Sequence, residues 1–106
     1  MPKIITTLAV PTEHPCYADH FLGNPIVPGA LILQWLCNLI HSRMPELTIR
    51  EIKSSKFLNP LLPGEQCEVQ IEHAPEQQHV VVFCKSNDKP ICQCRLSVES
   101  GKEVNA

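Results

Sequence analysis

The sequence predicts an α+β domain in which one long helix is wrapped by a curved antiparallel β-sheet. The segment 28–43 contains many large apolar residues, and its polar residues Gln34, Asn38 and His41 recur at i, i+4 and i+7 as one narrow stripe. Several other segments alternate apolar and polar side chains, as strands with one solvated face do. Because such a helix must be buried nearly all round, we expect the sheet to curl around it and a second subunit to complete a dimer.

The elements follow from local signals along the chain. Strands are expected in the segments 3–11, 46–60, 64–74, 78–86 and 91–99, which are separated by turn residues such as those of LLPGE and SNDKP. The helix begins at about Pro28 or Gly29 and runs to about Arg43, just before MPE, whose proline stops further propagation. We expect one domain over residues 1–106, with frayed termini at 1–5 and 100–106.

Length and charge limit the possible functions. The chain has 106 residues, enough for one core, and a net charge of −2 with a pI near 6.2 gives no field that would attract nucleic acid or an anionic membrane. The first residues lack the continuous apolar region of a signal peptide, and no apolar run approaches membrane-spanning length. We therefore expect a cytoplasmic protein with no membrane span.

The six cysteines are interpreted as reduced thiols that act as small hydrophobic side chains. In the last strand segment Cys92 and Cys94 alternate with polar residues, so they are expected to face the core. A metal site built from this pair with His73 or His79 would lack the spaced second ligand pair of zinc sites. The sequence therefore favours no metal site.

Two motifs carry a resemblance to a known family. The segment HFLGNPIVPGALIL (20–33) resembles the signature H-F-P-G-x-P-x-x-P-G-x-L of the hotdog-fold β-hydroxyacyl-ACP dehydratases. Downstream, KFLNPLLPGE (56–65) is similar to that family's K-F-x-x-P-x-x-P-G-D, in the same order and at the family's spacing. The resemblance spans roughly residues 6–99 and implies a compact, single-domain, dimeric hotdog protein that dehydrates 3-hydroxyacyl thioesters without a cofactor.

The chemistry gives these motif residues their expected roles. A base that removes a proton next to a thioester carbonyl should titrate near neutral pH, and His20 stands at the family's catalytic-histidine position. Free backbone N–H groups at the helix start, beside Gly29, can stabilise the developing oxyanion. The substrate-binding candidates are Phe21, Pro28, Ala30, Trp35 and Phe57. Trp35 and the leucines around it are consistent with an acyl tunnel, but most of them fit ordinary core better.

Gln34 departs from the family pattern, which has a glutamate or aspartate there to give a proton to the leaving hydroxyl. A carboxamide can orient a hydroxyl or a water but cannot act as a general acid. Three explanations stay open: an acid such as Asp19 or Glu13 could replace it, a paralogous subunit could lend a carboxylate, or the chain could be a hotdog thioesterase. The leading hypothesis is a dehydratase of fatty acid or specialised lipid or polyene biosynthesis; the alternatives are a thioesterase and a catalytically weak subunit.

The expected partners are an acyl carrier protein or an acyl-CoA thioester, and a second subunit that is either identical or homologous. Arg50, Lys53 and Lys56 near the second motif could dock an acidic carrier protein, or they could be an ordinary solvated strand edge. His14 is interpreted as a surface or loop residue. The other histidines, His41, His73 and His79, are interpreted as structural or solvent-facing.

Overall fold

A computed structural model describes residues 3–15, 26–74, 76 and 78–100 and shows one helix against one five-stranded sheet over this part of the chain. The strand order is β1-β3-β4-β5-β2, and all neighbouring pairs are antiparallel. The elements are β1 (Lys3–Ala9), α2 (Gly29–Arg43), β2 (Leu47–Phe57), β3 (Gln66–Ala74), β4 (His79–Ser86) and β5 (Lys89–Ser100).

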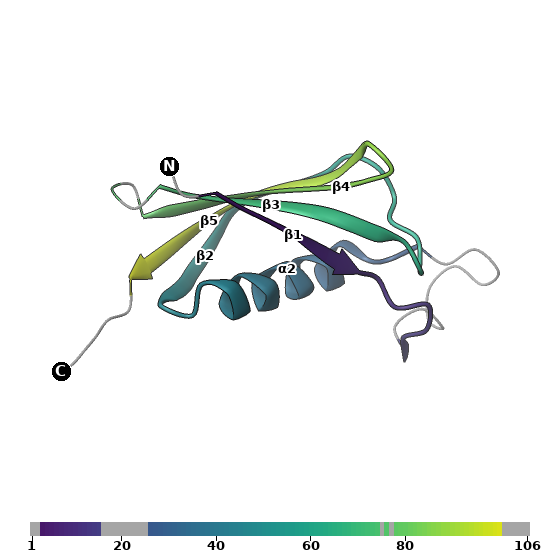
Figure 1. Cartoon of the computed structure of the whole chain (residues 1–106), viewed down its shortest axis with the longest axis horizontal. Coiled ribbons are helices and arrows are strands. Elements are labelled where there is room, and N and C mark those ends of the chain that lie inside the picture. Colours follow the sequence, from purple (N-terminus) through teal and green to yellow (C-terminus); the bar gives the residue numbers. More distant parts are fainter. Residues whose placement is uncertain (1–2, 16–25, 75, 77, 101–106) are drawn as a thin grey trace.

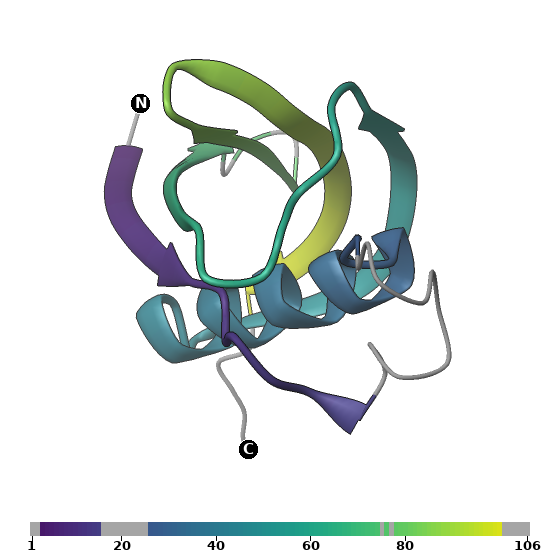
Figure 2. The ribbon, with the colours of Figure 1, turned by 90° about the vertical axis from the view of Figure 1, so that its right-hand side faces the viewer.

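The helix lies across the concave side of the sheet. Figure 1 shows α2 beneath the sheet, and Figure 2 shows the strands curving over it, with β1 and β2 at opposite edges. This arrangement confirms the prediction of a helix wrapped by a curved antiparallel sheet. It follows from the alternation in the strands, because each strand turns one set of side chains toward the helix.

The core is apolar and lies between α2 and the inner face of the sheet. Cys92, Cys94, Leu96 and Val98 of β5 are all buried, as the alternation in that strand predicted. The sheet meets a row of helix side chains at i, i+4 and i+8, namely Ile32, Leu36 and Ile40. The five cysteines within the described residues, Cys37, Cys67, Cys84, Cys92 and Cys94, are free thiols.

One side of the helix remains open in the single chain. Gln34, Asn38 and His41 are exposed, whereas Leu33, Trp35 and Leu39 are half-buried against the core. The expectation that the helix is buried nearly all round is therefore not met within one chain.

The predicted boundaries agree closely with the observed ones. Residues 3–5 lie in β1 rather than in a frayed terminus, because Lys3, Ile4 and Ile5 pair with β3. Strand β5 begins at Lys89, two residues before the predicted start, because the tight turn at Asn87 and Asp88 lets Lys89 pair with Ser86. Among the described residues no helix has the length and apolarity needed to cross a membrane.

Candidate active site at the helix N-terminus

A cavity of about 390 Å³ opens beside the start of α2. Two segments that are distant in sequence form it: residues 26–32, which enter the helix, and residues 57–61, which leave β2. They are the segments of the two sequence motifs. The side chains that line it are predominantly apolar: Ile26, Val27, Ile32, Phe57, Leu58, Pro60 and Leu61, together with Gly29 and Asn59. An apolar cavity with few polar groups is suited to an acyl chain.

The helix start presents free backbone donors next to this cavity. Pro28 is extended, with φ −64° and ψ 146°, and its carbonyl accepts the first helical hydrogen bonds, from the N–H groups of Leu31 and Ile32, both at 3.1 Å. The N–H groups of Gly29 and Ala30 precede these bonds, and no acidic residue occupies the first turn. The positive end of the helix dipole is therefore available to a negative oxygen.

Gly29 is the point of closest approach between the two motifs. A Cβ atom at this position would lie 2.9 Å from Cζ and 3.0 Å from Cε2 of Phe57, closer than side chains tolerate. The missing side chain at Gly29 thus makes room for the Phe57 ring, which is 44% exposed. Any acyl group that reaches the helix start has to share this space with the ring.

Backbone hydrogen bonds hold the second motif in place. The Val27 N–H donates to the Leu61 carbonyl at 2.9 Å, which joins the two motifs directly. The Leu58 N–H donates to Ile91 O at 2.8 Å, and the Asn59 side-chain amide donates to Pro90 O at 2.7 Å. Leu61 itself is fully buried. The cavity wall is therefore anchored to both the helix start and β5.

The structure brings together only some of the predicted site residues. His20 and Phe21 lie outside the described residues. Pro28 is half-buried at the helix start, and Ala30 and Gln34 are exposed on α2; none of the three lines the cavity. Gln34 thus stands on the open side of the helix.

Trp35 also lies away from the cavity. It is half-buried against the core, and the ring of His14 meets it edge-on, with a centroid distance of 6.1 Å and an interplanar angle of 80°. His14 lies in a loop, as predicted, and its contact with Trp35 leaves it half-buried against the helix.

Several cavity residues escaped the sequence interpretation even though the motifs contained them. Ile26 and Val27 belong to the first motif, and Leu58, Asn59 and Leu61 belong to the second. Their place within the two motifs was the sequence signal that could have identified them as cavity residues. Only the structure shows that Leu61 reaches back to Val27 and so connects the two motifs.

The buried thiols lie together in the core and do not line the cavity at the helix start. Hydrogen bonds with Cys67 and Cys92, together with burial, raise the pKa of the Cys84 thiol, and the same hydrogen bonds lower the pKa of Cys67 and of Cys92. The same two effects, with Cys92 as the acceptor, raise the pKa of Cys94. Burial also raises the pKa of Cys37 on the helix. Over the described parts of the chain, no group of three or more His, Cys, Asp or Glu side chains is arranged to hold a metal ion.

Comparison with known proteins identifies relatives for most of the chain. The sequence profile of the ApeI-like family, described as ApeI dehydratase, matches residues 1–95. The 3-hydroxyacyl-[acyl-carrier-protein] dehydratase FabZ of Haemophilus influenzae strain PittEE is 30% identical over 106 residues, covering 89% of this chain and 70% of the relative.

Solved structures share the same hotdog fold. The dehydratase heterocomplex ApeI:P from Xenorhabdus doucetiae aligns with a TM-score of 0.79 at 18% identity, covering 91% of this chain and 86% of the other. The R-hydratase PhaJ1 from Pseudomonas aeruginosa aligns with a TM-score of 0.73 at 13% identity, covering 96% and 81%. At these identities the likeness establishes the fold, a helix wrapped by a five-stranded antiparallel sheet.

Proposed function

Because this chain belongs to the ApeI-like dehydratase family, we propose that it eliminates water from a 3-hydroxyacyl thioester to leave a trans-2-enoyl thioester. The observation that carries the proposal is the cavity in which the start of α2, Gly29 and Phe57 meet. It combines apolar walls for an acyl chain with backbone donors for a carbonyl oxygen. The described residues therefore meet two requirements of the reaction, a binding site for the acyl chain and hydrogen-bond donors for the carbonyl oxygen.

In the proposed reaction a base removes the proton on the carbon next to the thioester carbonyl. The electrons move onto the carbonyl oxygen, which becomes negatively charged, and then return to form the double bond as the hydroxyl leaves with a proton. His20 is our candidate base, supported by its place in the first motif and by the titration range of imidazole.

The helix start is our candidate oxyanion site. The N–H groups of Gly29 and Ala30 precede the first intrahelical bonds, and the helix dipole adds a partial positive charge there. Donors that are already in position stabilise the charge of the transition state without further reorganisation. The ring of Phe57 then limits how an acyl group enters, since it occupies the space above Gly29.

Gln34 is our candidate for positioning the leaving hydroxyl. Its side chain is exposed on α2, where a partner subunit could bring a histidine to it. An amide can hold the hydroxyl by a hydrogen bond but cannot supply the departing proton. We therefore propose slower turnover than a carboxylate would give, unless Asp19, Glu13 or a homologous subunit provides the acid.

The second subunit that this site requires is proposed to pair along β2. This strand forms one edge of the sheet, and most of it is exposed, including the apolar side chains of Ile52 and Phe57. An exposed apolar edge strand readily pairs with another chain. Pairing there would place two helices on the same side of a continuous sheet and could cover the open stripe of α2, with either a second copy or a homologue as the partner.

The proposed acyl donor is an acyl carrier protein or coenzyme A thioester. Lys56 adjoins Phe57 at the cavity and could guide an acidic carrier, whereas Arg50 and Lys53 already lie near carboxylates. Arg50 Nη1 is 3.6 Å from Glu99 Oε1, and Lys53 Nζ is 3.5 Å from Glu51 Oε1. We place the protein in the cytoplasm, a reducing compartment that agrees with its five free thiols among the described residues.

The test is the reverse reaction, hydration of a short trans-2-enoyl thioester, followed by loss of the conjugated absorbance. The wild type should turn over, and His20→Ala should stop turnover while leaving the circular dichroism spectrum unchanged. His41→Ala, an exposed histidine at the far end of α2, is the matched control and should keep full activity. An inactive wild type on both carrier-protein and coenzyme A thioesters would refute the proposal.

A thioesterase is the second candidate, favoured by one observation. Gln34 suits the positioning of an attacking water better than the protonation of a leaving group. Release of free thiol from a saturated acyl thioester, without hydration of an enoyl thioester, would establish this alternative. A subunit without its own activity would show neither reaction alone and would gain hydration when mixed with a homologue that carries the carboxylate.

A further inference from the structure

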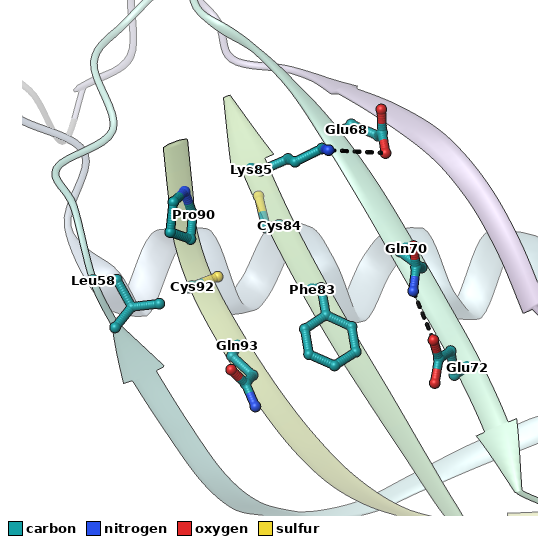
Figure 3. Close-up of a pocket in the computed structure, with 10 residues that line it drawn as sticks. All are labelled: Leu58, Glu68, Gln70, Glu72, Phe83, Cys84, Lys85, Pro90, Cys92 and Gln93. Atoms are coloured by element: carbon teal, nitrogen blue, oxygen red, sulfur yellow. Dashed lines mark hydrogen bonds and ion pairs between the residues drawn. The ribbon is translucent and has the colours of Figure 1, made fainter. Parts of the chain in front are cut away.

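The outer face of the sheet carries a second hollow, away from the helix. It has a volume of about 310 Å³ and lies over the parts of β3, β4 and β5 drawn in Figure 3. Phe83, at its centre, is 37% exposed, and Leu58 at its rim is 45% exposed. Exposed apolar side chains that gather in a hollow are typical of a surface that another protein covers.

The strand register arranges this face in ordered rows. One row runs Gln70, Phe83, Gln93 across β3, β4 and β5, and Figure 3 shows Phe83 between the two glutamines. The neighbouring row runs Glu72, Val81, Arg95 across the same strands. In both rows an apolar side chain on β4 separates two polar side chains that are complementary in hydrogen bonding or charge.

Two copies of this face are complementary when they are related by a two-fold axis. The axis lies midway between the two facing sheets and runs parallel to β4. Such an axis leaves β4 opposite β4 and exchanges β3 with β5. Phe83 of one copy then meets Phe83 of the other, and each Gln70 faces Gln93 of the other copy. Each Glu72 faces Arg95 of the other copy.

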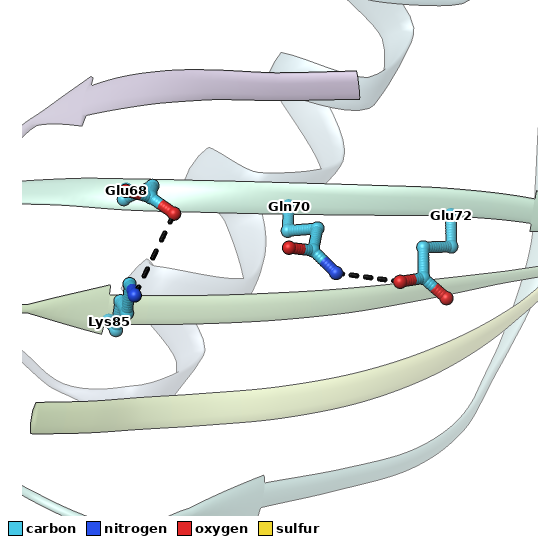
Figure 4. Close-up of polar contacts among 4 residues, drawn as sticks. All are labelled: Glu68, Gln70, Glu72 and Lys85. Carbon is cyan, nitrogen blue, oxygen red and sulfur yellow. Dashed lines mark hydrogen bonds and ion pairs between the residues drawn. The ribbon is translucent and has the colours of Figure 1, made fainter. Parts of the chain in front are cut away.

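Within one copy Lys3 is the register partner of Glu72 on β1, but the described residues show no ion pair between them. Within a single sheet the backbones of Glu72 and Arg95 are two strands apart, about 10 Å, and no ion pair joins the two side chains among the described residues. No carboxylate lies within ion-pairing distance of Arg95 over the described parts of the chain, and Glu72 accepts only the Gln70 side-chain amide, at 2.6 Å. Figure 4 shows that Glu68 already has Lys85 beside it, at 3.9 Å, so this pair adds no net charge to the face.

We propose that the outer faces of two copies pack against each other about this axis, with Phe83 at the centre and two Glu72–Arg95 ion pairs on either side of the neighbouring Val81. Aligned sheets pack about 10 Å apart and cross at a small angle, so these rows remain opposed near the centre of the contact. The contact is separate from the β2 edge and does not depend on the catalytic proposal. Together with pairing at β2, it would build an assembly of four copies.

The test measures mass in solution by light scattering on the purified full chain, with folding checked by circular dichroism. Glu72→Arg alone and Arg95→Glu alone each place like charges opposite one another, so each should halve the mass of the wild-type assembly. The double variant E72R/R95E restores opposite charges and should restore the mass. Phe83→Lys should also halve it, whereas Glu46→Arg, an exposed charge reversal outside the sheet, should not change it.

Each alternative result contradicts the proposal. A monomeric wild type, or single variants with the wild-type mass, would show that the outer face is not a contact between copies. Single variants that dissociate without rescue by the double variant would show that Glu72 and Arg95 do not face each other. If Ile52→Lys on β2 dissociates the assembly and the outer-face variants do not, all association between copies occurs at the edge strand.

Discussion

The cavity at the helix start and the hollow on the outer face are similar in volume and differ in how they are built. The cavity at the helix start, about 390 Å³, is bounded by backbone: Gly29 without a side chain, the first turn of α2 and a loop held by main-chain hydrogen bonds. The outer hollow, about 310 Å³, is bounded by strand side chains whose polar groups partly pair among themselves. The first can receive a developing charge, whereas the second presents a patterned surface.

The difference shows that volume alone does not identify an active site. Leu58 lines both hollows, so the two are adjacent in space. Only the one beside the helix start has fixed backbone donors directed at a small group. The following changes should affect one hollow and spare the other.

The largest effect is expected from Gln34→Glu. A carboxyl group at this position can supply the proton that the carboxamide cannot, so the enoyl-thioester hydration rate should rise by about a hundredfold to ten-thousandfold. Steady-state kinetics measure this change. Asn38→Asp, one turn further along the same exposed stripe, is the matched control and should leave the rate unchanged. A flat rate in Gln34→Glu would mean that the pocket has diverged beyond this residue.

A large loss of stability is expected from Leu61→Ala. The Leu61 side chain is fully buried, so truncation leaves a cavity under the active-site wall and should lower the free energy of unfolding by about 2–5 kcal/mol. Urea denaturation gives the value. The adjacent Leu62→Ala, with a side chain 43% exposed, should cost less than about 1 kcal/mol. Equal losses in the two variants would contradict the burial of the Leu61 side chain beneath the cavity wall.

A smaller effect on activity is expected from Gly29→Ala. The new methyl group would meet the Phe57 ring at 2.9 Å, and the exposed ring should move into the cavity rather than unfold the domain. We expect the hydration rate to fall about tenfold, equivalent to about 1.4 kcal/mol, with little change in stability. Phe57→Leu combined with Gly29→Ala should recover part of the loss. No recovery would indicate that the methyl group blocks substrate directly.

The smallest effect is expected on the outer face from Glu68→Gln. The carboxylate is 3.9 Å from Lys85, and both side chains are half exposed, so solvent screens the pair. Thermal unfolding should show a stability change below about 1 kcal/mol, and catalysis should not change. A large loss of activity in this variant would show that the two hollows are coupled through Leu58.

The sequence was sufficient to predict the elements and the inner face. Alternation in β3 and β5 placed Cys67, Cys92 and Cys94 toward the core, and the helix began and ended where Gly29 and Arg43 indicated. Periodicity predicts such features because one face of each element must be buried. The motifs also predicted that Gly29 and Phe57 belong to the site region, and both line the cavity.

Contacts between distant segments could not be predicted in this way. Nothing in the pattern shows that the Phe57 ring fills the space above Gly29, or that Leu61 bonds to Val27, because these contacts depend on the path of the loop after β2. The rows on the outer face needed the strand register, which a single sequence does not specify. Trp35, an acyl-tunnel candidate, lies against His14 instead of in the cavity, since its helix face is set by packing.

The most direct test of the account is an amide chemical-shift titration of the protein with a non-hydrolysable acyl-pantetheine analogue. We expect the amide signals of Gly29, Ala30 and residues 57–61 to shift as the analogue is added, until binding is saturated. The amide signals of Gln70, Phe83 and Gln93 should not shift. Shifts centred on Phe83, with Gly29 and Ala30 unchanged, would contradict the assignment of the acyl thioester to the helix start.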